Sequence, residues 1–528
     1  MIRNAQVLPL RLRALGLAGR AHSDPARVAA HFLALQGQDF WAARWALGLR
    51  SGAGEEAVRA AFDCGDLVRG WPMRGTLHVM AAADALWLQR LDWELSGAGA
   101  AERRLADLPH SPRDWSRALD AAAEALDAGP LSRAELVAVA ARALAARGAG
   151  GGADRALAAG REARADVGTG AARTGGAGGA ARPSGALAAA GTRGADRAPG
   201  GSDSGRAGGP SAAGGEASGA RREMPRGVPA GQTWGAQSPE QRMARRLLTH
   251  LVGAGIAVFG PTRGTEQLLA LAETWIPAPR RLDLEEALAE IATGFVRSHG
   301  PATERDLARW AGRSLGEARR GIAAAGDRVV RVPGENGVEW LVAPDALDAP
   351  QDWDAPGANN VGATGARVLG SAGAGVAAGH DGLVPGANNA SAIDGIVPGG
   401  KDGIGHRAQG VPGLGVRLLP AFDEHVLGYA NRSAQLRPAD EPLVVPGRNG
   451  VFKPTVTVDG VAVGTWSAPG PAATARLGGD RPVPISVAPF DRARGRKLGR
   501  RALAAAAQEY AAYLGRPGAE VALPSHNA

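Results

Sequence analysis

A short pattern that occurs twice constrains the fold of this chain more than any other feature. Residues 129–136 and 300–307 both read Gly-Pro-x-[Ser/Thr]-x-x-[acid]-Leu, and an amphipathic helical pattern precedes each copy. The Ser or Thr, with the acid three residues later, forms a capping box, which starts a helix. Each copy therefore predicts one helix, a tight turn and a second helix, as in a helix-turn-helix unit.

The second copy continues into a third helix and a hairpin. Ser314 and Glu317 form another capping box, which opens a helix that ends near residue 325. Residues 329–332 and 338–342 then have the composition of two short strands. This order of capped helices and a hairpin predicts a winged helix-turn-helix.

The first copy is interrupted before its third helix. Residues 147–232 consist almost entirely of Gly, Ala, Arg, Ser and Pro. Such a segment cannot bury enough apolar surface to fold, so we expect a disordered insertion. The missing helix follows at 241–252, with a strand at 256–260. A second low-complexity tract, 346–413, is expected to be a further disordered insertion.

The two ends of the chain follow different patterns. Helices at 24–35 and 55–68 with a strand at 74–80 indicate another winged helix. Beyond the second insertion, short strands are expected at 443–446, 452–458 and 461–466, and a final helix at 497–514. The expected fold is mainly α with small β elements. Its predicted domains are winged helix 1 at 1–110, winged helix 2 at 111–280, winged helix 3 at 281–345, the second insertion at 346–413, and a β-barrel with a C-terminal helix at 414–528.

Composition excludes several classes of protein. Cys64 is the only cysteine, which rules out disulfides and cysteine-rich metal sites and fits a reducing cytoplasm. No apolar run reaches the ~18 residues that indicate a membrane span. The ten His residues show no metal-ligand spacing. We therefore expect a soluble, cytoplasmic protein with no metal and no cofactor.

Positive charge is carried almost entirely by Arg. The formal net charge is +8, and all but three of the 60 Lys and Arg residues are Arg. Two explanations of this excess of Arg are open. One is codon bias; the other is phosphate binding, because the guanidinium fork pairs with phosphate oxygens. A cluster near the C-terminus allows two interpretations, a phosphate-binding patch or a solvated helix start. Its members are Arg492, Arg494, Arg496, Lys497, Arg500 and Arg501.

The strongest candidate for chemistry is the segment Gln36-Gly37-Gln38. Side chains two residues apart point about 200° away from each other on a helix, but they share a face in an extended segment. Gly37 favours the end of the preceding helix. Two amides, each both donor and acceptor, can then converge on one small target. Asp39 either assists them or caps the next helix.

Five sequence blocks, in this order, resemble a known family. They are the Leu-Gln-Gly-Gln-Asp and Ala-Ala-Arg-Trp-Ala-Leu-Gly-Leu-Arg blocks of 35–50, Trp-Pro-Met-Arg-Gly-Thr-Leu-His at 71–78, Gly-Pro-Ala-Thr at 300–303, Leu-Leu-Pro-Ala-Phe-Asp-Glu at 418–424, and Asn-Gly-Val-Phe-Lys-Pro-Thr at 449–455 with Gly-Thr-Trp at 464–466. Together they look like the bacterial winged-helix DNA-binding family that contains the AlkZ-like (interstrand-crosslink) DNA glycosylases. The likeness covers the chain apart from the two insertions.

The resemblance implies a fold, an activity and a partner. The fold would be three tandem winged helices curved around double-stranded DNA and closed by the β-barrel. The family's Gln-x-Gln motif matches Gln36 and Gln38, which implies a DNA glycosylase that excises N7-alkylated purines, including crosslinked ones. Gly37 departs from the pattern, because an aliphatic residue often stands there, and we expect it to loosen the two amides. The N-terminal half outside the insertion has no Lys for a Schiff base, so a monofunctional enzyme is expected. We also expect it to be a monomer.

Other residues in these blocks have a functional and a structural interpretation. Arg44, Arg50 and Arg74 either contact DNA phosphates or bind backbone carbonyls, and His78 either joins them on the DNA or is structural. Trp41, Trp45 and Trp71 either pack in a core or stack on a base. Asp423 and Glu424 either anchor the β-barrel to a neighbouring helix or act as acid and base.

The whole chain also has a second interpretation, a non-catalytic winged-helix DNA-binding or regulatory protein. A regulator usually pairs one winged helix with a dimer domain and reads a palindrome. Three unequal units in one chain argue against that, so the glycosylase is the leading hypothesis.

Overall fold

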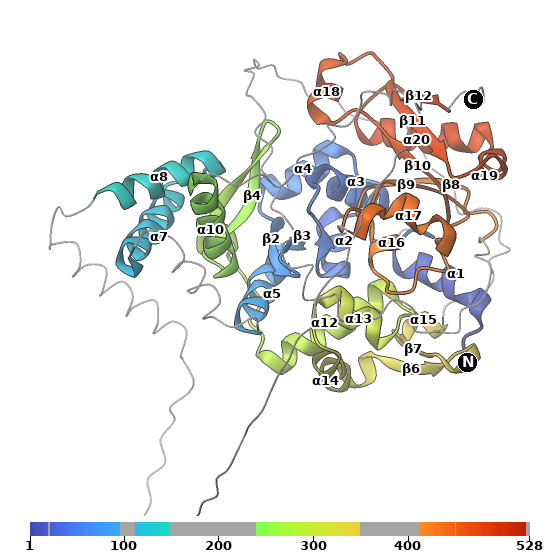
Figure 1. Ribbon diagram of the computed structural model, residues 1–528, viewed down its shortest axis with the longest axis horizontal. Helices are drawn as coiled ribbons and strands as arrows, with labels where there is room; N and C mark the ends of the chain where they lie inside the picture. Colours follow the sequence, from blue (N-terminus) through green and yellow to red (C-terminus); the bar gives the residue numbers. More distant parts are fainter. Residues whose placement is uncertain (20–21, 96–110, 147–238, 349–410, 449, 524–528) are drawn as a thin grey trace, which may run out of the picture. The chain divides into compact units, whose positions relative to one another are not determined.

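Figure 1 shows the computed structural model of this protein, which describes residues 1–19, 22–95, 111–146, 239–348, 411–448 and 450–523. Helices predominate, and the strands form two five-stranded sheets and a two-stranded one. The expectation of a mainly helical chain with small β elements is confirmed. The two predicted insertions lie almost entirely outside the described residues. Within the described part, no helix is long and apolar enough to cross a bilayer.

The N-terminal region carries the candidate site between helices and a hairpin. Its elements are α1 (Asn4–Ala14), α2 (Pro25–Phe32), β1 (Leu35–Gln36), α3 (Phe40–Ser51), α4 (Glu55–Asp63), β2 (Leu67–Met73), β3 (Thr76–Ala81) and α5 (Ala82–Leu95). Strands β2 and β3 form the hairpin, and β1 pairs antiparallel with the other side of β3. Gln36 on β1 lies opposite His78 on β3.

A second hairpin extends this sheet. The elements around it are α7 (Pro112–Asp127), α8 (Arg133–Ala145), α10 (Pro239–Gly253), β4 (Ala257–Arg263), β5 (Glu266–Leu271) and α11 (Ala272–Trp275). Strand β4 pairs with β2 where Phe259 faces Arg69, which gives the strand order β1-β3-β2-β4-β5. The predicted capping box is present, since Glu135 N–H donates to Ser132 Oγ at 3.1 Å.

The third region follows the same order of helices and hairpin. It comprises α12 (Leu284–His299), α13 (Glu304–Ala311), α14 (Leu315–Ala325), β6 (Val330–Pro333), β7 (Glu339–Val342) and the short α15 (Asp345–Asp348). Both predicted capping boxes are present, and Thr303 and Ser314 each accept a hydrogen bond of 3.2 Å from the N–H three residues on. The division of the chain into three winged helices stays a prediction.

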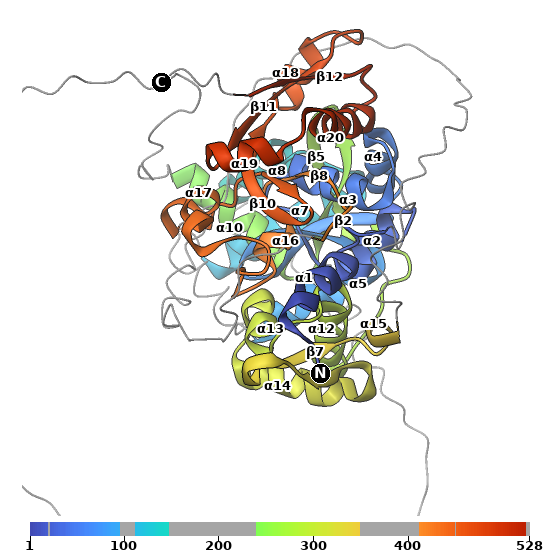
Figure 2. The same ribbon diagram turned by 90° about the vertical axis from the view of Figure 1, so that its right-hand side faces the viewer.

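The C-terminal region is built on the second five-stranded sheet, whose order is β12-β11-β10-β9-β8. Its elements are β8 (Val416–Leu419), α16 (Glu424–Leu427), α17 (Glu441–Val444), β9 (Thr455–Val458), β10 (Val461–Ser467), α18 (Pro471–Arg476), β11 (Val483–Pro489), α19 (Arg492–Lys497), α20 (Arg500–Tyr513) and β12 (Ala519–Ala522). Figure 2 shows α20 lying against this sheet near β8. The closure of the sheet into a barrel stays a prediction.

Several predicted element boundaries were wrong. The helix expected at 24–35 ends at Phe32, because Leu33 adopts a positive φ of 61° and the chain then becomes extended. The helix expected at 55–68 ends at Asp63, and Leu67 already belongs to β2. The expected strand 74–80 begins only at Thr76, because the preceding residues form the turn of the hairpin.

The C-terminal predictions contained two further errors. Residues 443–446 were expected to form a strand, but Pro442 lies in the first turn of the short helix α17, where its missing N–H costs nothing. The final helix was expected to be continuous over 497–514. It is broken at Leu498 and Gly499, with α19 before the break and α20 after it. Strands β11 and β12 were not foreseen.

One hydrophobic core joins the two ends of the chain. It contains Leu47 of α3 and Phe62 of α4 together with Val456 of β9 and Tyr513 of α20, all nearly inaccessible to solvent. Gly48 permits this packing, because a Cβ there would lie 2.4 Å from the Tyr513 ring. The N-terminal helices that flank the Gln36-Gly37-Gln38 segment are therefore braced by the C-terminal sheet.

Candidate functional site

The main chain of the Gln36-Gly37-Gln38 segment is held on both sides. Strand β1 ends at Gln36, and the Gly37 N–H donates to the Leu77 carbonyl of β3 at 2.8 Å. The Gly37 carbonyl accepts a hydrogen bond of 3.0 Å from Nη1 of Arg69 on β2. Gln36 therefore ends a strand, and the chain bends at Gln38 before α3 begins. That the two Gln side chains share one face stays a prediction.

The two side-chain amides are also tied to the main chain. Gln36 Oε1 accepts a hydrogen bond of 2.8 Å from the Gln38 N–H, and Gln38 Oε1 accepts one of 3.2 Å from the Leu77 N–H. Gln36 is 7% exposed and Gln38 is half-buried. Each carbonyl oxygen has a second lone pair, so the fixed amides can still accept a hydrogen bond from a ligand or a water.

Gly37 tightens this segment instead of loosening it. A Cβ at this position would lie 3.0 Å from the Val79 N and 3.1 Å from the His78 carbonyl carbon. A side chain at this position would be crowded against the β3 main chain, so glycine favours this close approach. The sequence-based expectation of loosely held amides was therefore wrong, because both main-chain polar groups of Gly37 are hydrogen-bonded.

Arg69 is a buried residue that sequence reasoning missed. It is 5% exposed, and its guanidinium lies 4.6 Å from the Phe40 ring centroid and 5.3 Å from that of Phe259. Burial lowers the pKa of Arg69 to about 9, and the charge of Arg133 acts in the same direction. The guanidinium therefore remains charged at neutral pH. No local pattern around residue 69 identifies it, because its partner is a main-chain carbonyl from another strand.

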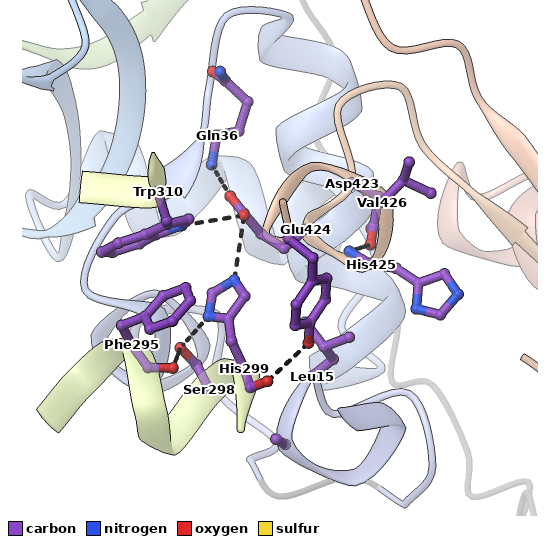
Figure 3. A network of polar contacts seen from close by, with 12 residues as sticks. Leu15, Gln36, Phe295, Ser298, His299, Trp310, Asp423, Glu424, His425 and Val426 are labelled. Atoms are coloured by element: carbon purple, nitrogen blue, oxygen red, sulfur yellow. Dashed lines mark hydrogen bonds and ion pairs between the residues drawn. The ribbon is translucent and has the colours of Figure 1, made fainter. Parts of the chain in front are cut away.

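Glu424 reaches the segment from the C-terminal region. Figure 3 shows its carboxylate between Gln36, His299 and Trp310. Glu424 Oε1 accepts a hydrogen bond of 3.0 Å from the main-chain N–H of Gln36. Its side chain is 1% exposed. The sequence-based alternative in which this acid anchors the C-terminal region to its neighbours matches these contacts.

Asp39 caps helix α3. Its Oδ1 accepts hydrogen bonds of 3.0 Å from the N–H groups of both Trp41 and Ala42, and its side chain is exposed. Of the two interpretations of Asp39, the structure shows the helix cap.

Arg44 and Arg50 lie inside the protein. Arg44 forms an ion pair of 2.6 Å with Glu55 and stacks 3.9 Å from the Trp41 ring centroid. Arg50 makes two hydrogen bonds of 2.9 Å to the two carboxylate oxygens of Asp423. Burial raises the pKa of the Asp423 carboxyl, but the Arg50 charge and hydrogen bonds outweigh it and hold that pKa below its usual range.

Arg74 and His78 form a pair behind the hairpin turn. Nη2 of Arg74 lies 2.9 Å from Nε2 of His78, and Nδ1 of His78 lies 2.8 Å from the Thr76 carbonyl. The carbonyl can only accept, so Nδ1 carries the proton and Nε2 accepts from Arg74. Burial, aided by the Arg74 charge, holds the pKa of His78 well below its usual range, so the ring is neutral.

The three tryptophans take part in packing. The Trp45 indole N–H donates to the Leu418 carbonyl at 2.8 Å, and its ring contacts Tyr513. Trp41 supports Arg44, and Trp71 lies edge-on to Phe259 with ring centroids 5.6 Å apart. The structure therefore brings Gln36, Gln38 and Asp39 together on one segment, whereas the three indole rings pack against other side chains of the protein.

Two comparisons with known proteins identify the family of this chain. The family model described as "DNA glycosylase AlkZ-like" matches residues 29–198, 138–370 and 363–513. The Streptomyces sahachiroi DNA glycosylase AlkZ has a similar fold, with a TM-score of 0.53 over 98% of this chain and 98% of that one, at 18% sequence identity. No protein with a curated description matches the chain. The family matches span the described chain from α2 to α20, and the protein belongs to the AlkZ-like DNA glycosylase family.

Proposed function

We propose that this protein is a monofunctional DNA glycosylase that hydrolyses the N-glycosidic bond of N7-alkylated purines or of interstrand crosslinks joined through them. Double-stranded DNA is its proposed partner, and Gln36 and Gln38 are its proposed catalytic residues. The observation that carries the proposal is the pair of amide oxygens on this segment, one held by the main-chain N–H of Gln38 and the other by that of Leu77.

The proposed chemistry needs no strong acid or base. An N7-alkylated purine already carries a positive charge, so the pair of electrons of the C1′–N9 bond leaves with the base and neutralises it. Water then adds its oxygen to C1′ and loses a proton to solvent. Amide oxygens held at fixed positions can orient this water and favour the positive charge that develops on the sugar. Asp39, beside Gln38, is the proposed assisting residue.

Arg44 and Arg50 are not among the proposed contacts to the DNA backbone. Both guanidinium groups are buried and already paired with carboxylates, so we leave these residues out of the proposed interface. Arg74 stays a proposed contact near the segment. His78 is left out as well, because it is fully buried and both of its ring nitrogens are already hydrogen-bonded. Phosphate binding is instead proposed for the exposed cations at the junction of α19 and α20.

Two features of that junction favour a phosphate ligand. Five exposed cations have no ion pair within the described residues: Arg492, Arg496, Lys497, Arg500 and Arg501. Helix α20 also begins with two of these cations after Gly499, with no capping side chain and no acid in its first turn. A helix N-terminus disfavours cations and attracts anions, so this arrangement costs stability unless an anion binds there.

The proposal is tested on a duplex that contains a single N7-methylguanine. Released base is measured by chromatography, and abasic sites are revealed with an abasic-site endonuclease. Wild type is expected to release the base and to cut no strand by itself, whereas Gln36→Ala/Gln38→Ala is expected to lose at least a hundredfold in rate. Gln267→Ala is the matched control, because Gln267 is a buried amide whose hydrogen bonds within the described residues go to main-chain carbonyls on another hairpin.

The competing function is a non-catalytic winged-helix DNA-binding or regulatory protein. Salt-sensitive duplex binding by wild type without any base release, on N7-methylguanine or on a crosslink, would establish it. The amide pair would then be a structural feature of the β1–α3 connection.

A further inference from the structure

We propose that Glu424 is a positioning residue for the reaction, which holds the Gln36-Gly37-Gln38 segment in place through the main-chain N–H of Gln36. This inference rests on the proposed function, because it concerns the same site. It assigns a role to the Leu-Leu-Pro-Ala-Phe-Asp-Glu block of 418–424, which the proposed chemistry does not use.

The orientation of the Glu424 carboxylate is set by two further donors. Its Oε2 lies 3.3 Å from Nε2 of His299 and 3.3 Å from Nε1 of Trp310 (Figure 3). These residues come from α12 and α13, so the carboxylate joins three separate stretches of the chain. With Oε2 engaged in this way, Oε1 faces the Gln36 N–H.

The donors themselves have little freedom. The His299 ring stacks on Phe295 with centroids 4.6 Å apart, and its Nδ1 lies 2.8 Å from Ser298 Oγ. The Tyr429 hydroxyl donates to the His299 carbonyl at 2.9 Å. Both His299 and Glu424 are almost completely buried. A side chain held by so many contacts can fix the segment that it binds.

The position of β1 explains why such a support is needed. Strand β1 lies at the edge of its sheet, with β3 on one side only. The Gln36 N–H is directed to Glu424, and the Gly37 N–H to β3. Without Glu424, this edge N–H would be buried and unpaired. Because Gln36 Oε1 binds the Gln38 N–H, a shift of Gln36 displaces both amides together.

Glu424 is placed to support and not to react. Both of its oxygens already accept hydrogen bonds, and its side chain is 1% exposed, so it offers no surface to a substrate water. A general base must reach the proton that it abstracts, directly or through one water. The carboxylate therefore acts on the reaction only through Gln36.

The test compares Glu424→Gln with Asp423→Asn. The two acids are neighbours and both are buried, but Asp423 binds Arg50 and caps α16, and none of its hydrogen bonds within the described residues reaches the segment. A Gln at 424 keeps the size of the side chain and turns one acceptor into a donor, which conflicts with the donors around it. We would measure the single-turnover excision rate at saturating enzyme, the Kd for the duplex and the Tm.

Both variants are expected to lower Tm. Only Glu424→Gln is expected to lower the excision rate, by ten- to a hundredfold, with the Kd unchanged, whereas Asp423→Asn stays within about twofold of wild type. A wild-type rate in Glu424→Gln, or an equal loss of rate in both variants, would overturn the inference. If Glu424→Gln does not fold, Trp310→Phe removes one donor and is expected to lower the rate about threefold; no change there overturns the inference as well.

Failure of the proposed function is recognised separately. If wild type releases no base, hydrogen exchange of the Gln36 amide replaces the rate as the readout. In Glu424→Gln, the exchange rate of the Gln36 amide is expected to rise at least tenfold more than the exchange rate of the Gly37 amide. In Asp423→Asn, the two rates are expected to change by the same factor. Equal exchange of the Gln36 amide in wild type and Glu424→Gln would show that Glu424 does not position the segment.

Discussion

Arginines in the interior of this protein and arginines at the α19–α20 junction have opposite surroundings. Arg44 and Arg50 are buried against carboxylates, and Arg69 is buried against the Gly37 carbonyl. At the junction, Arg494 is likewise buried and paired with Asp440. The other four arginines there are exposed and have no ion pair within the described residues: Arg492, Arg496, Arg500 and Arg501. Buried guanidinium groups link segments that are distant in sequence, whereas exposed unpaired ones provide a field that attracts a polyanion. The same residue type therefore serves structure in one region and proposed DNA contact in the other.

The largest effect is expected from breaking an interior pair. Arg50→Met leaves the buried carboxylate of Asp423 without its partner and is expected to lower the free energy of unfolding by about 3–5 kcal/mol. Denaturant unfolding measures this loss. Arg500→Met is the control from the exposed region and is expected to change stability by less than about 0.5 kcal/mol. A similar loss in both variants would remove the distinction between the two regions.

The second prediction concerns DNA affinity. Replacement of Arg492, Arg496, Arg500 and Arg501 by Gln is expected to weaken duplex binding about ten- to a hundredfold at low salt. The slope of log K against log salt should become shallower by about 0.9 for each phosphate contact that is lost. Filter binding or fluorescence anisotropy across a salt series measures both quantities.

Four exposed arginines in the third region provide a matched control for that variant. Arg319, Arg320, Arg328 and Arg331 each form an ion pair with a glutamate. Their replacement by Gln removes the same number of positive charges, but these charges are already paired with glutamates. The slope of log K against log salt should therefore stay close to that of wild type. If the salt slope becomes shallower by the same amount in both quadruple variants, the net charge of the protein accounts for DNA binding, and the junction has no special role.

Local sequence signals predicted the helix starts well. The capping boxes at Ser132, Thr303 and Ser314 are present as expected, because all of their atoms lie within four consecutive residues. That the segment Gln36-Gly37-Gln38 lies outside a helix also followed from a local argument, since glycine disfavours a helix. The mainly helical fold with small sheets could be predicted for the same reason.

Long-range contacts could not be predicted in this way. The partners of Gln36 and Gly37 are Glu424 and Arg69, and neither has a signal in its own neighbourhood that points to the segment. Leu33 ended helix α2 early through a positive φ that a leucine seldom adopts. The surroundings of Arg44 and Arg50 were equally hidden, because whether a cation is buried depends on packing between segments far apart in sequence.

The smallest effect is expected from pH, and it again separates interior from surface. Burial lowers the pKa of His31 and of His425 to about 4 from an ordinary value of 6.5. Between these pH values the unfolded state binds more protons than the folded state. The free energy of unfolding therefore has its full value above pH 6.5 and decreases as the pH falls towards 4. At pH 5.5 each histidine should lower the free energy of unfolding by about 1 kcal/mol relative to pH 7.5.

His31→Gln should remove the contribution of one histidine to the pH dependence of the free energy of unfolding. The junction quadruple variant should keep the whole pH dependence, because arginines stay charged throughout this range. If His31→Gln leaves the pH dependence of unfolding unchanged, the His31 ring does not take up a proton when the protein unfolds.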